Sequence, residues 1–248
     1  MNSLKKFSVL RITGNKRSRI EETVVTEAKL TIVVNDQKLA ILPCSPNELK
    51  FLAIGFLFSK GIVTSKEEIK KINLDERKWI VRVETEKDIH LSSLPLNVIY
   101  YTSDRTAQSK VKSRISVASH SVFSLLEAFQ HRSKIFISTG GVHSVALCEK
   151  NEILAFKEDI SRNNAIDKLF GECILNDIST AQRMLVTSCR ISSEILLKVA
   201  KRNIPILISK SAPTDLAVRL ALEVGITLIG FVRGKRMNVY ANEWRVIS

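Results

Sequence analysis

The chain has 248 residues and a formal net charge of +13, because 38 Lys and Arg outnumber 25 Asp and Glu. With 45% hydrophobic residues, 9 Gly and 5 Pro, the composition excludes collagen-like and intrinsically disordered architectures. The longest uninterrupted apolar stretch, residues 51–58, is far shorter than the roughly 18 residues of a membrane-spanning helix. We therefore expect a globular protein of one large or two modest domains that does not enter a membrane.

The amino end carries Lys5 and Lys6 without a following apolar segment, so we predict no secretory signal and expect a cytoplasmic protein. Four cysteines lie far apart in the sequence, and no CxxC or HxxxH spacing predicts a zinc site or a dithiol pair. The simplest interpretation is that each cysteine is a small buried hydrophobic residue. They are Cys44, Cys148, Cys173 and Cys189.

The first part of the chain has the pattern of strands followed by one helix. Residues 30–34 and 37–42 are predicted strands, and the pair 35–36 between them suits a two-residue hairpin turn. The sequence Ser-Pro-Asn-Glu at 45–48 predicts a capping box that starts a helix, and Gly61 is placed to end it.

A boundary follows this region. Residues 79–83 alternate like a half-buried strand, whereas the stretch 103–116 is polar without an apolar period and is predicted to be a loop. We therefore divide the chain into a β-rich amino-terminal subdomain with one capped helix and a basic loop, residues 1–112, and an α/β core, residues 113–248.

The second part alternates between strands and helices. We predict strands at 135–138, 145–148, 153–156, 184–187, 206–209 and 227–232, and helices at 164–175, 192–202 and 214–224. Strands separated by helices of this length form βαβ units, which require parallel strands with right-handed crossovers. Helices are then expected to cover both faces of the sheet, in an αβα arrangement.

Ligands of open parallel sheets bind beyond the carboxyl ends of the strands. Those ends here offer hydroxyl groups, glycines and cations, and helix amino ends add oriented N–H groups, so an anionic, phosphate-bearing ligand is favoured. The alternative is that the hydroxyls cap helices and the cations are solvated. The candidate binding residues at these ends are Thr139, Gly140, Gly141, His143, Arg190, Lys210 and Ser211, followed by the cationic segment 231–236.

Two features remain open at this point. His143 is either a proton donor or ligand, or a structural histidine. The dense polar run 159–168 is either helix capping and surface charge or the wall of a site. No GxxxxGK[ST] loop or GxGxxG fingerprint is present, which disfavours a nucleotide-hydrolysing enzyme.

Several blocks of the sequence resemble one known family. TGGVHSVAL from Thr139, EDISRNNAIDK from Glu158, SAPTDLAV from Ser211 and TLIGFVRGKRMNVY from Thr227 look like signature blocks of the formate dehydrogenase accessory protein family, the FdhD/NarQ type. NELKFLAIGFLFSKGIV from Asn47 resembles the amino-terminal block of that family. The similarity is collinear over most of the chain, which is far more specific than any one motif.

The resemblance implies a cytoplasmic maturation factor that receives sulfur from a cysteine desulfurase. Such factors pass the sulfur to the molybdenum cofactor before its insertion into formate dehydrogenase, and they are expected to be homodimers. The family fold is similar to that of cytidine deaminases, but this chain lacks the HxE and PCxxC zinc ligands, so the deaminase reaction does not follow. Family members bind the bis guanine dinucleotide cofactor through the block that corresponds to Phe231, Val232, Arg233, Gly234, Lys235 and Arg236.

The chain departs from the family at the sulfur-carrying cysteines. The family's CxxC loop corresponds to residues 101–114 here, which contain no cysteine, and Ser or Thr cannot replace a thiolate as the carrier. Cys189 is the best replacement, because a strand end, a helix amino end and Arg190 are expected to lower the pKa of its thiol. Asn163 stands where the family usually has His, and Cys189 where it usually has Gly.

Two functions are therefore weighed. The first is a sulfurtransferase in which another cysteine, such as Cys189, carries the persulfide. The second is a non-enzymatic chaperone or scaffold that binds a molybdenum or tungsten guanine-dinucleotide cofactor and docks an apo-enzyme. Nucleic-acid binding is a distant third, because basic clusters are present but aromatic residues make up only 6% of the chain.

Overall fold

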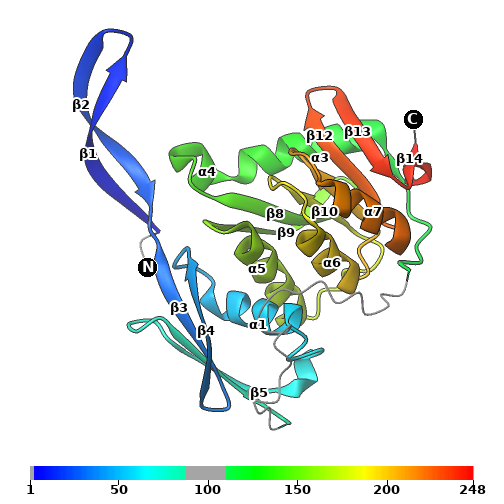
Figure 1. Ribbon diagram of the computed structural model, residues 1–248, viewed down its shortest axis with the longest axis horizontal. Coiled ribbons are helices and arrows are strands. Elements are labelled where there is room, and N and C mark those ends of the chain that lie inside the picture. Colours follow the sequence, from blue (N-terminus) through cyan, green and yellow to red (C-terminus); the bar gives the residue numbers. More distant parts are fainter. Residues whose placement is uncertain (1–2, 88–109, 248) are drawn as a thin grey trace.

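A computed structural model describes residues 3–87 and 110–247 (Figure 1). The chain begins with a two-stranded antiparallel ribbon, β1 (Leu4–Thr13) and β2 (Lys16–Val25), which projects away from the remaining elements in Figure 1. A four-stranded sheet and a six-stranded sheet with helices on both faces follow. The predicted α/β class with a β-rich amino-terminal region is confirmed.

The four-stranded sheet has the order β4-β3-β6-β5. The pairs β3–β4 and β5–β6 are antiparallel, whereas β3 and β6 are parallel. Asn35 and Asp36 join β3 to β4 with φ angles of 44° and 63°, the left-handed values that a type I′ turn requires, so the hairpin prediction is confirmed. The strands are β3 (Ala28–Val34), β4 (Gln37–Cys44), β5 (Ile69–Asp75) and β6 (Ile80–Thr85).

Helix α1 (Leu49–Ser59) follows this hairpin, but the predicted capping box is wrong. Glu48 precedes the helix in a left-handed conformation, with φ of 55°, and no side chain caps the first turn. Ser45 bonds to the core instead: its N–H donates to Asp159 Oδ2 and its Oγ accepts from the N–H of Ile160. Gly61, with φ of 71°, follows the helix as predicted.

The six-stranded sheet has the order β13-β12-β11-β10-β8-β9. The three strands predicted to lie in βαβ units are parallel to one another, which confirms that prediction. β8 pairs antiparallel with both β10 and β9, and β13 pairs antiparallel with β12. The strands are β8 (His143–Glu149), β9 (Glu152–Asp159), β10 (Met184–Thr187), β11 (Ile206–Ser209), β12 (Thr227–Arg233) and β13 (Arg236–Ala241).

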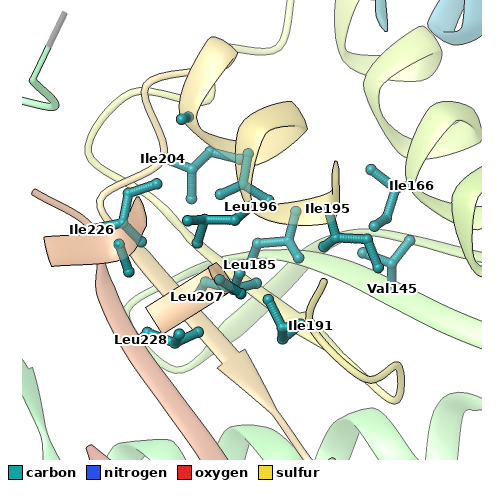
Figure 2. Packing of buried hydrophobic residues seen from close by; sticks show 14 of the residues in the cluster. Val145, Ile166, Leu185, Ile191, Ile195, Leu196, Ile204, Leu207, Ile226 and Leu228 are labelled. Carbon is teal, nitrogen blue, oxygen red and sulfur yellow. The ribbon is translucent and has the colours of Figure 1, made fainter. Parts of the chain in front are cut away.

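Helices cover both faces of this sheet. Leu125 and Phe129 of α3 (Ser119–Arg132) pack on one face, in a cluster with Val186 of β10. Figure 2 shows the opposite side, where Leu185, Leu207 and Leu228 of adjacent strands meet Leu196 and Ile195 of a helix. The helices on that face are α5 (Arg162–Leu175), α6 (Ser193–Lys201) and α7 (Asp215–Val224). The layers are those of the predicted αβα arrangement, while its cytidine deaminase-like label stays a prediction.

The strand predicted at 135–138 is wrong, because these residues belong to the helix α4 (Lys134–Thr139). The β-branched and aromatic composition of the segment favours a strand. However, Phe136 and Ile137 remain 46% and 65% exposed, and the first strand of this sheet starts only at His143. Gly140, with φ of 64°, ends α4. The shorter elements are η1 (Lys66–Glu68), β7 (Val117–Ala118), η3 (Glu243–Arg245) and β14 (Val246–Ile247).

We call the four-stranded sheet with α1 the amino-terminal layer, and the six-stranded sheet with its helices the core. The two meet where α1 crosses α5. A Cβ atom on Gly55 would lie 1.8 Å from the carbonyl oxygen of Asp167, and one on Gly171 would lie 1.9 Å from the carbonyl oxygen of Phe51. Only glycine allows the two helix backbones to come this close. We call this contact the α1–α5 joint. The subdomain boundary predicted near residue 112 stays a prediction, since most of the predicted loop lies outside the described residues.

No helix in the described ranges is long and apolar enough to cross a membrane.

Candidate functional site

The polar strand ends meet at one edge of the six-stranded sheet. Because β8 is antiparallel to its neighbours, His143 at its start pairs with Asp159 at the end of β9. Thr187 and Ser209 lie opposite each other at the ends of β10 and β11. The topology thus gathers segments from four parts of the sequence, as expected for a ligand site in a sheet of this kind.

A cavity of about 530 Å³ opens at this edge, between the strand ends and the helices α3 and α4. Its volume suits a small ligand or one portion of a larger cofactor. Six predicted binding residues line it: Gly140, Gly141, His143, Lys210, Ser211 and Arg233. The other lining residues are Phe129, Gln130, Ser133, Phe136, Ile137, Val142, Ser144 and Ser188. We call this the strand-end cavity.

Two cations give the strand-end cavity its charge. Lys210 Nζ donates to Gln130 Oε1 at 2.9 Å, and the guanidinium of Arg233 lies 5.6 Å from the ring centre of Phe231. Within the described ranges, neither cation is in a salt bridge with a carboxylate. Their charge is therefore available to an anionic ligand, which Arg binds through a planar fork of donors.

Phe231 holds this region in an unusual conformation. Its φ is 54°, which is rare for a bulky residue, and the register between β12 and β13 shifts between Gly230 and Arg233. The N–H of Phe231 donates to the carbonyl oxygen of Ser211 at 3.1 Å. This hydrogen bond ties the loop after β11 to the cationic segment. It helps to offset the strain of the left-handed backbone at Phe231, two residues before Arg233 at the end of β12.

Hydroxyl groups line the inner part of the strand-end cavity. Ser133 Oγ donates to the buried carboxylate of Glu158 and lies 2.6 Å from Ser144 Oγ. Ser188 Oγ accepts from the N–H of Ser144 at 3.0 Å. The cavity therefore combines cations with hydroxyl groups that a buried carboxylate orients, which suits a ligand carrying both anionic and hydrogen-bonding groups.

His143 is half-buried at the wall of the strand-end cavity. Burial lowers the pKa of its imidazole, and the nearby positive charges of Arg162 and Arg190 lower it further. The side chain is therefore uncharged near pH 7, able to donate from one ring nitrogen and accept at the other.

Several predicted residues lie away from the strand-end cavity lining. Val232 is buried in the core, and Thr139 Oγ1 donates to the carbonyl oxygen of Ile135 at 2.7 Å within α4. Arg190, Gly234, Lys235 and Arg236 are exposed, the last three at the turn between β12 and β13. The cationic segment 231–236 thus supplies a single side chain, that of Arg233, to the cavity lining.

The expected lowering of the Cys189 pKa is wrong. Cys189 is fully buried in the apolar cluster between the sheet and its helices, and burial raises the pKa of its thiol. All four cysteines are buried and in thiol form. Burial also raises the pKa of Cys44 and of Cys173 to about 11, and that of Cys148 to about 12. None of these thiols has the exposed, cationic surroundings of a reactive cysteine.

The polar run 159–168 contributes to the α1–α5 joint. Lys168 Nζ lies 2.7 Å from Asp159 Oδ2, and both side chains are completely buried. Lys168 also donates to Asn47 Oδ1 at 3.0 Å, and Asn164 Nδ2 donates to the carbonyl oxygen of Pro43 at 2.8 Å. These residues hold the amino-terminal layer against the core, so their role is neither helix capping nor surface charge. Other members of the run line a cavity, as the second interpretation allows.

Four lining residues are not among those predicted from the sequence: Gln130, Ser133, Ser144 and Ser188. Ser144 lies inside a strand, where alternation predicts only which face it occupies. Gln130 lies in the last turn of α3 and Ser133 directly follows it, and this helix was not predicted. Ser188 directly follows the strand predicted at 184–187, so its place at a strand end is the signal that could have identified it.

The chain is a three-layer α/β protein with a cationic cavity at the strand ends of its larger sheet. A family model described as the FdhD/NarQ family matches residues 25–247. The chain therefore belongs to the FdhD/NarQ family.

Curated relatives are similar along nearly their whole length. The sulfur carrier protein FdhD of Bacillus subtilis is 39% identical, covering 96% of this chain and 95% of the relative. That of Bacillus pumilus is 39% identical, covering 91% and 90%, and that of Listeria innocua is 36% identical, covering 99% and 100%. A crystal structure from Desulfotalea psychrophila, proposed to be a formate dehydrogenase accessory protein, shares the fold with a TM-score of 0.85 at 24% identity. It covers 99% of this chain and 100% of that chain.

Proposed function

We propose that this protein is a formate dehydrogenase accessory protein that acts in sulfur transfer to the molybdenum cofactor of that enzyme. The relatives named sulfur carrier protein FdhD support this role, since they align with almost the complete chain. A cysteine desulfurase is the proposed sulfur donor, formate dehydrogenase or a related molybdenum or tungsten enzyme is the client, and the cytoplasm is the proposed compartment. The working form is proposed to be a homodimer.

The guanine-dinucleotide form of the cofactor is the proposed cargo of the strand-end cavity. The observation that carries this proposal is the convergence of six predicted binding residues from three separate segments on one cavity. Lys210 and Arg233 would hold phosphate oxygens, and the hydroxyl groups of Ser133 and Ser144 would bond polar groups of the ligand. The cavity accommodates one nucleotide portion, so the remainder of a bis guanine-dinucleotide cofactor would extend outside it.

The burial of all four thiols favours a second candidate, a cofactor chaperone that carries no persulfide. A desulfurase transfers sulfur to an accessible thiolate, and burial raises the pKa of every cysteine in this chain. In the sulfur-carrier alternative, one of these thiols must become exposed when the desulfurase binds. The two candidates share the cofactor site and differ only in whether a persulfide forms.

Binding of GDP, measured by isothermal titration calorimetry, tests the cofactor site. We expect Arg233→Ala to weaken GDP binding about tenfold or more, because a charge-assisted contact to phosphate is lost. Lys235→Ala is the matched control, since Lys235 is an exposed cation of the same segment that does not line the cavity. Equal GDP affinity in the wild type and Arg233→Ala would remove the cavity from the proposal.

Intact-protein mass spectrometry after anaerobic incubation with a cysteine desulfurase and cysteine decides between the two candidates. A reducible increment of one sulfur atom, lost in only one single-cysteine variant, would identify the carrier. We would replace Cys44, Cys148, Cys173 and Cys189 singly with Ser, with a CxxC-containing relative as the positive control. Absence of the increment, with the relative modified in parallel, would leave the chaperone function.

A further inference from the structure

A second cavity, of about 490 Å³, lies at the α1–α5 joint and is distinct from the strand-end cavity. β4 and α1 of the amino-terminal layer form one side of it, and α5 and α6 of the core form the other. No residue lines both cavities. The volume of the second cavity lies in the range of small-molecule sites.

One wall of the second cavity is apolar. Leu39 and Leu42 of β4 line it together with Phe56 of α1 and with Ile62, which follows that helix. These side chains belong to or pack against the buried cluster of the amino-terminal layer, so the wall is held in place by the core of that layer. It offers a hydrophobic surface to one side of a ligand.

The opposite wall is polar and already contains a neutralised ion pair. Lys198 Nζ donates to both carboxylate oxygens of Asp167 at 2.8 Å, and Ser59 Oγ donates to the same carboxylate at 2.6 Å. Both charged side chains are almost completely buried. Next to them, Asn163 Oδ1 is enclosed and has no hydrogen-bond partner in the described part of the chain. A rotation of this amide would let either end bond to a ligand.

Two further charges of opposite sign complete the lining of the second cavity. Lys60 follows α1 and Glu194 lies in the first turn of α6, and both are half-buried. Burial lowers the pKa of Lys60, with a further contribution from the positive charge of Lys198. The lining therefore carries two cations and two anions, whereas the strand-end cavity presents cations alone among its charged lining residues.

We propose that the second cavity binds a small amphipathic zwitterion of the apolar α-amino acid class. The carboxylate of the ligand lies toward Lys60, its ammonium group lies toward Glu194, and its side chain packs against the apolar wall. A polyanion such as a nucleotide is disfavoured, because the two cations and two anions of the lining leave no net positive charge to attract it. This site is additional to the proposed cofactor function and does not depend on it.

Calorimetry with L-leucine and two matched probes tests the chemistry of the ligand. 4-Methylpentanoate keeps the carboxylate and side chain but lacks the ammonium group, and 3-methylbutylamine keeps the ammonium group but lacks the carboxylate. We expect L-leucine to bind and each probe to bind about tenfold more weakly or worse, since one charge-assisted contact is missing. No detectable binding of L-leucine or L-methionine at millimolar concentration would overturn the proposal.

Variants of the rim charges test the location. Lys60→Met and Glu194→Gln are each expected to weaken L-leucine binding about tenfold or more, with GDP binding unchanged. Lys60→Arg keeps the charge and is expected to retain binding. Lys38→Met and Glu223→Gln are the matched controls, since both residues are exposed and do not line the cavity. Unchanged L-leucine affinity in both rim variants would place the amino acid elsewhere and refute the site.

Discussion

The α1–α5 joint and the strand-end cavity use charged residues in opposite ways. At the joint, Lys168 meets Asp159 and both side chains are completely buried. At the cavity, Lys210 and Arg233 make no salt bridge within the described ranges. Burying an unpaired charge is too costly, so only the paired charges of the joint can lie in the interior. The cations of the cavity, which have no carboxylate partner, must remain accessible to solvent. Whether a charged side chain stabilises the fold or is available to a ligand therefore depends on its partner and not on its residue type.

The largest effect is expected from Gly55→Ala, which tests whether the joint is a rigid contact. The added Cβ would lie 1.8 Å from the carbonyl oxygen of Asp167, and both neighbours are helix backbones that cannot move independently. We expect a loss of at least about 3 kcal/mol in the free energy of unfolding, measured in urea, or failure to fold.

Lys50→Ala is the control for Gly55→Ala. Lys50 lies on the same helix and is exposed, so its truncation is expected to change the free energy of unfolding by less than about 0.5 kcal/mol. Stability of Gly55→Ala equal to that of the control would show that the two helices can separate without cost.

The next effect concerns the buried ion pair of the joint. Lys168→Met leaves the carboxylate of Asp159 buried without its cation, and we expect a loss of about 3 kcal/mol in the free energy of unfolding. In the double variant Asp159→Asn with Lys168→Met, no buried charge is left unpaired, so part of that loss is expected to be recovered. Urea unfolding of the four proteins of the cycle measures the coupling, and purely additive losses would contradict a direct pairing.

Arg233→Ala tests whether the cations of the strand-end cavity, unlike those of the α1–α5 joint, contribute little to stability. Arg233→Ala is expected to change the free energy of unfolding by less than about 0.5 kcal/mol, because Arg233 is exposed, although it is expected to weaken GDP binding. Chemical unfolding of the variant without ligand measures this. A large loss of stability would mean that Arg233 supports the fold, as Lys168 does.

The parts of the fold that the sequence predicts correctly depend on local patterns. The strands of β10, β11 and β12 and the helices between them follow from apolar periodicity, and their parallel pairing follows from the connections. The convergence of the strand ends follows in turn, because parallel strands place their carboxyl ends at one edge. This is why Lys210 and Arg233 could be predicted as neighbours without an alignment or a structure.

The features of the fold that the sequence does not predict depend on residues that are far apart in the chain. The pattern at 45–48 has the residues of a capping box, but Ser45 bonds to Asp159, 114 positions later in the chain. The surroundings of Cys189 suggested a low pKa, yet the side chains that bury it come from several helices and strands. Local propensity cannot anticipate either result, because burial and long-range hydrogen bonds are properties of the complete fold.

An effect that appears only at high pH tests the buried state of the cysteines. Burial raises the pKa of Cys148 from its ordinary value of 9.0 to about 12, so above pH 9 the unfolded chain releases this proton while the folded chain retains it. Stability conferred by the neutral thiol is therefore complete below pH 9 and is lost as the pH rises toward 12. By pH 10 the loss from this one thiol is expected to reach about 1.4 kcal/mol.

Urea unfolding between pH 8 and pH 10 measures this dependence. Cys148→Ala is expected to be less stable at every pH, because it leaves a cavity, but its stability should fall less steeply with pH than that of the wild type. Val186→Ala removes apolar atoms from the same buried cluster without removing a titratable group, so it should keep the wild-type slope. Identical slopes in Cys148→Ala and the wild type would mean that the thiol ionises without unfolding. An accessible thiolate of that kind would favour the sulfur-carrier role over the chaperone.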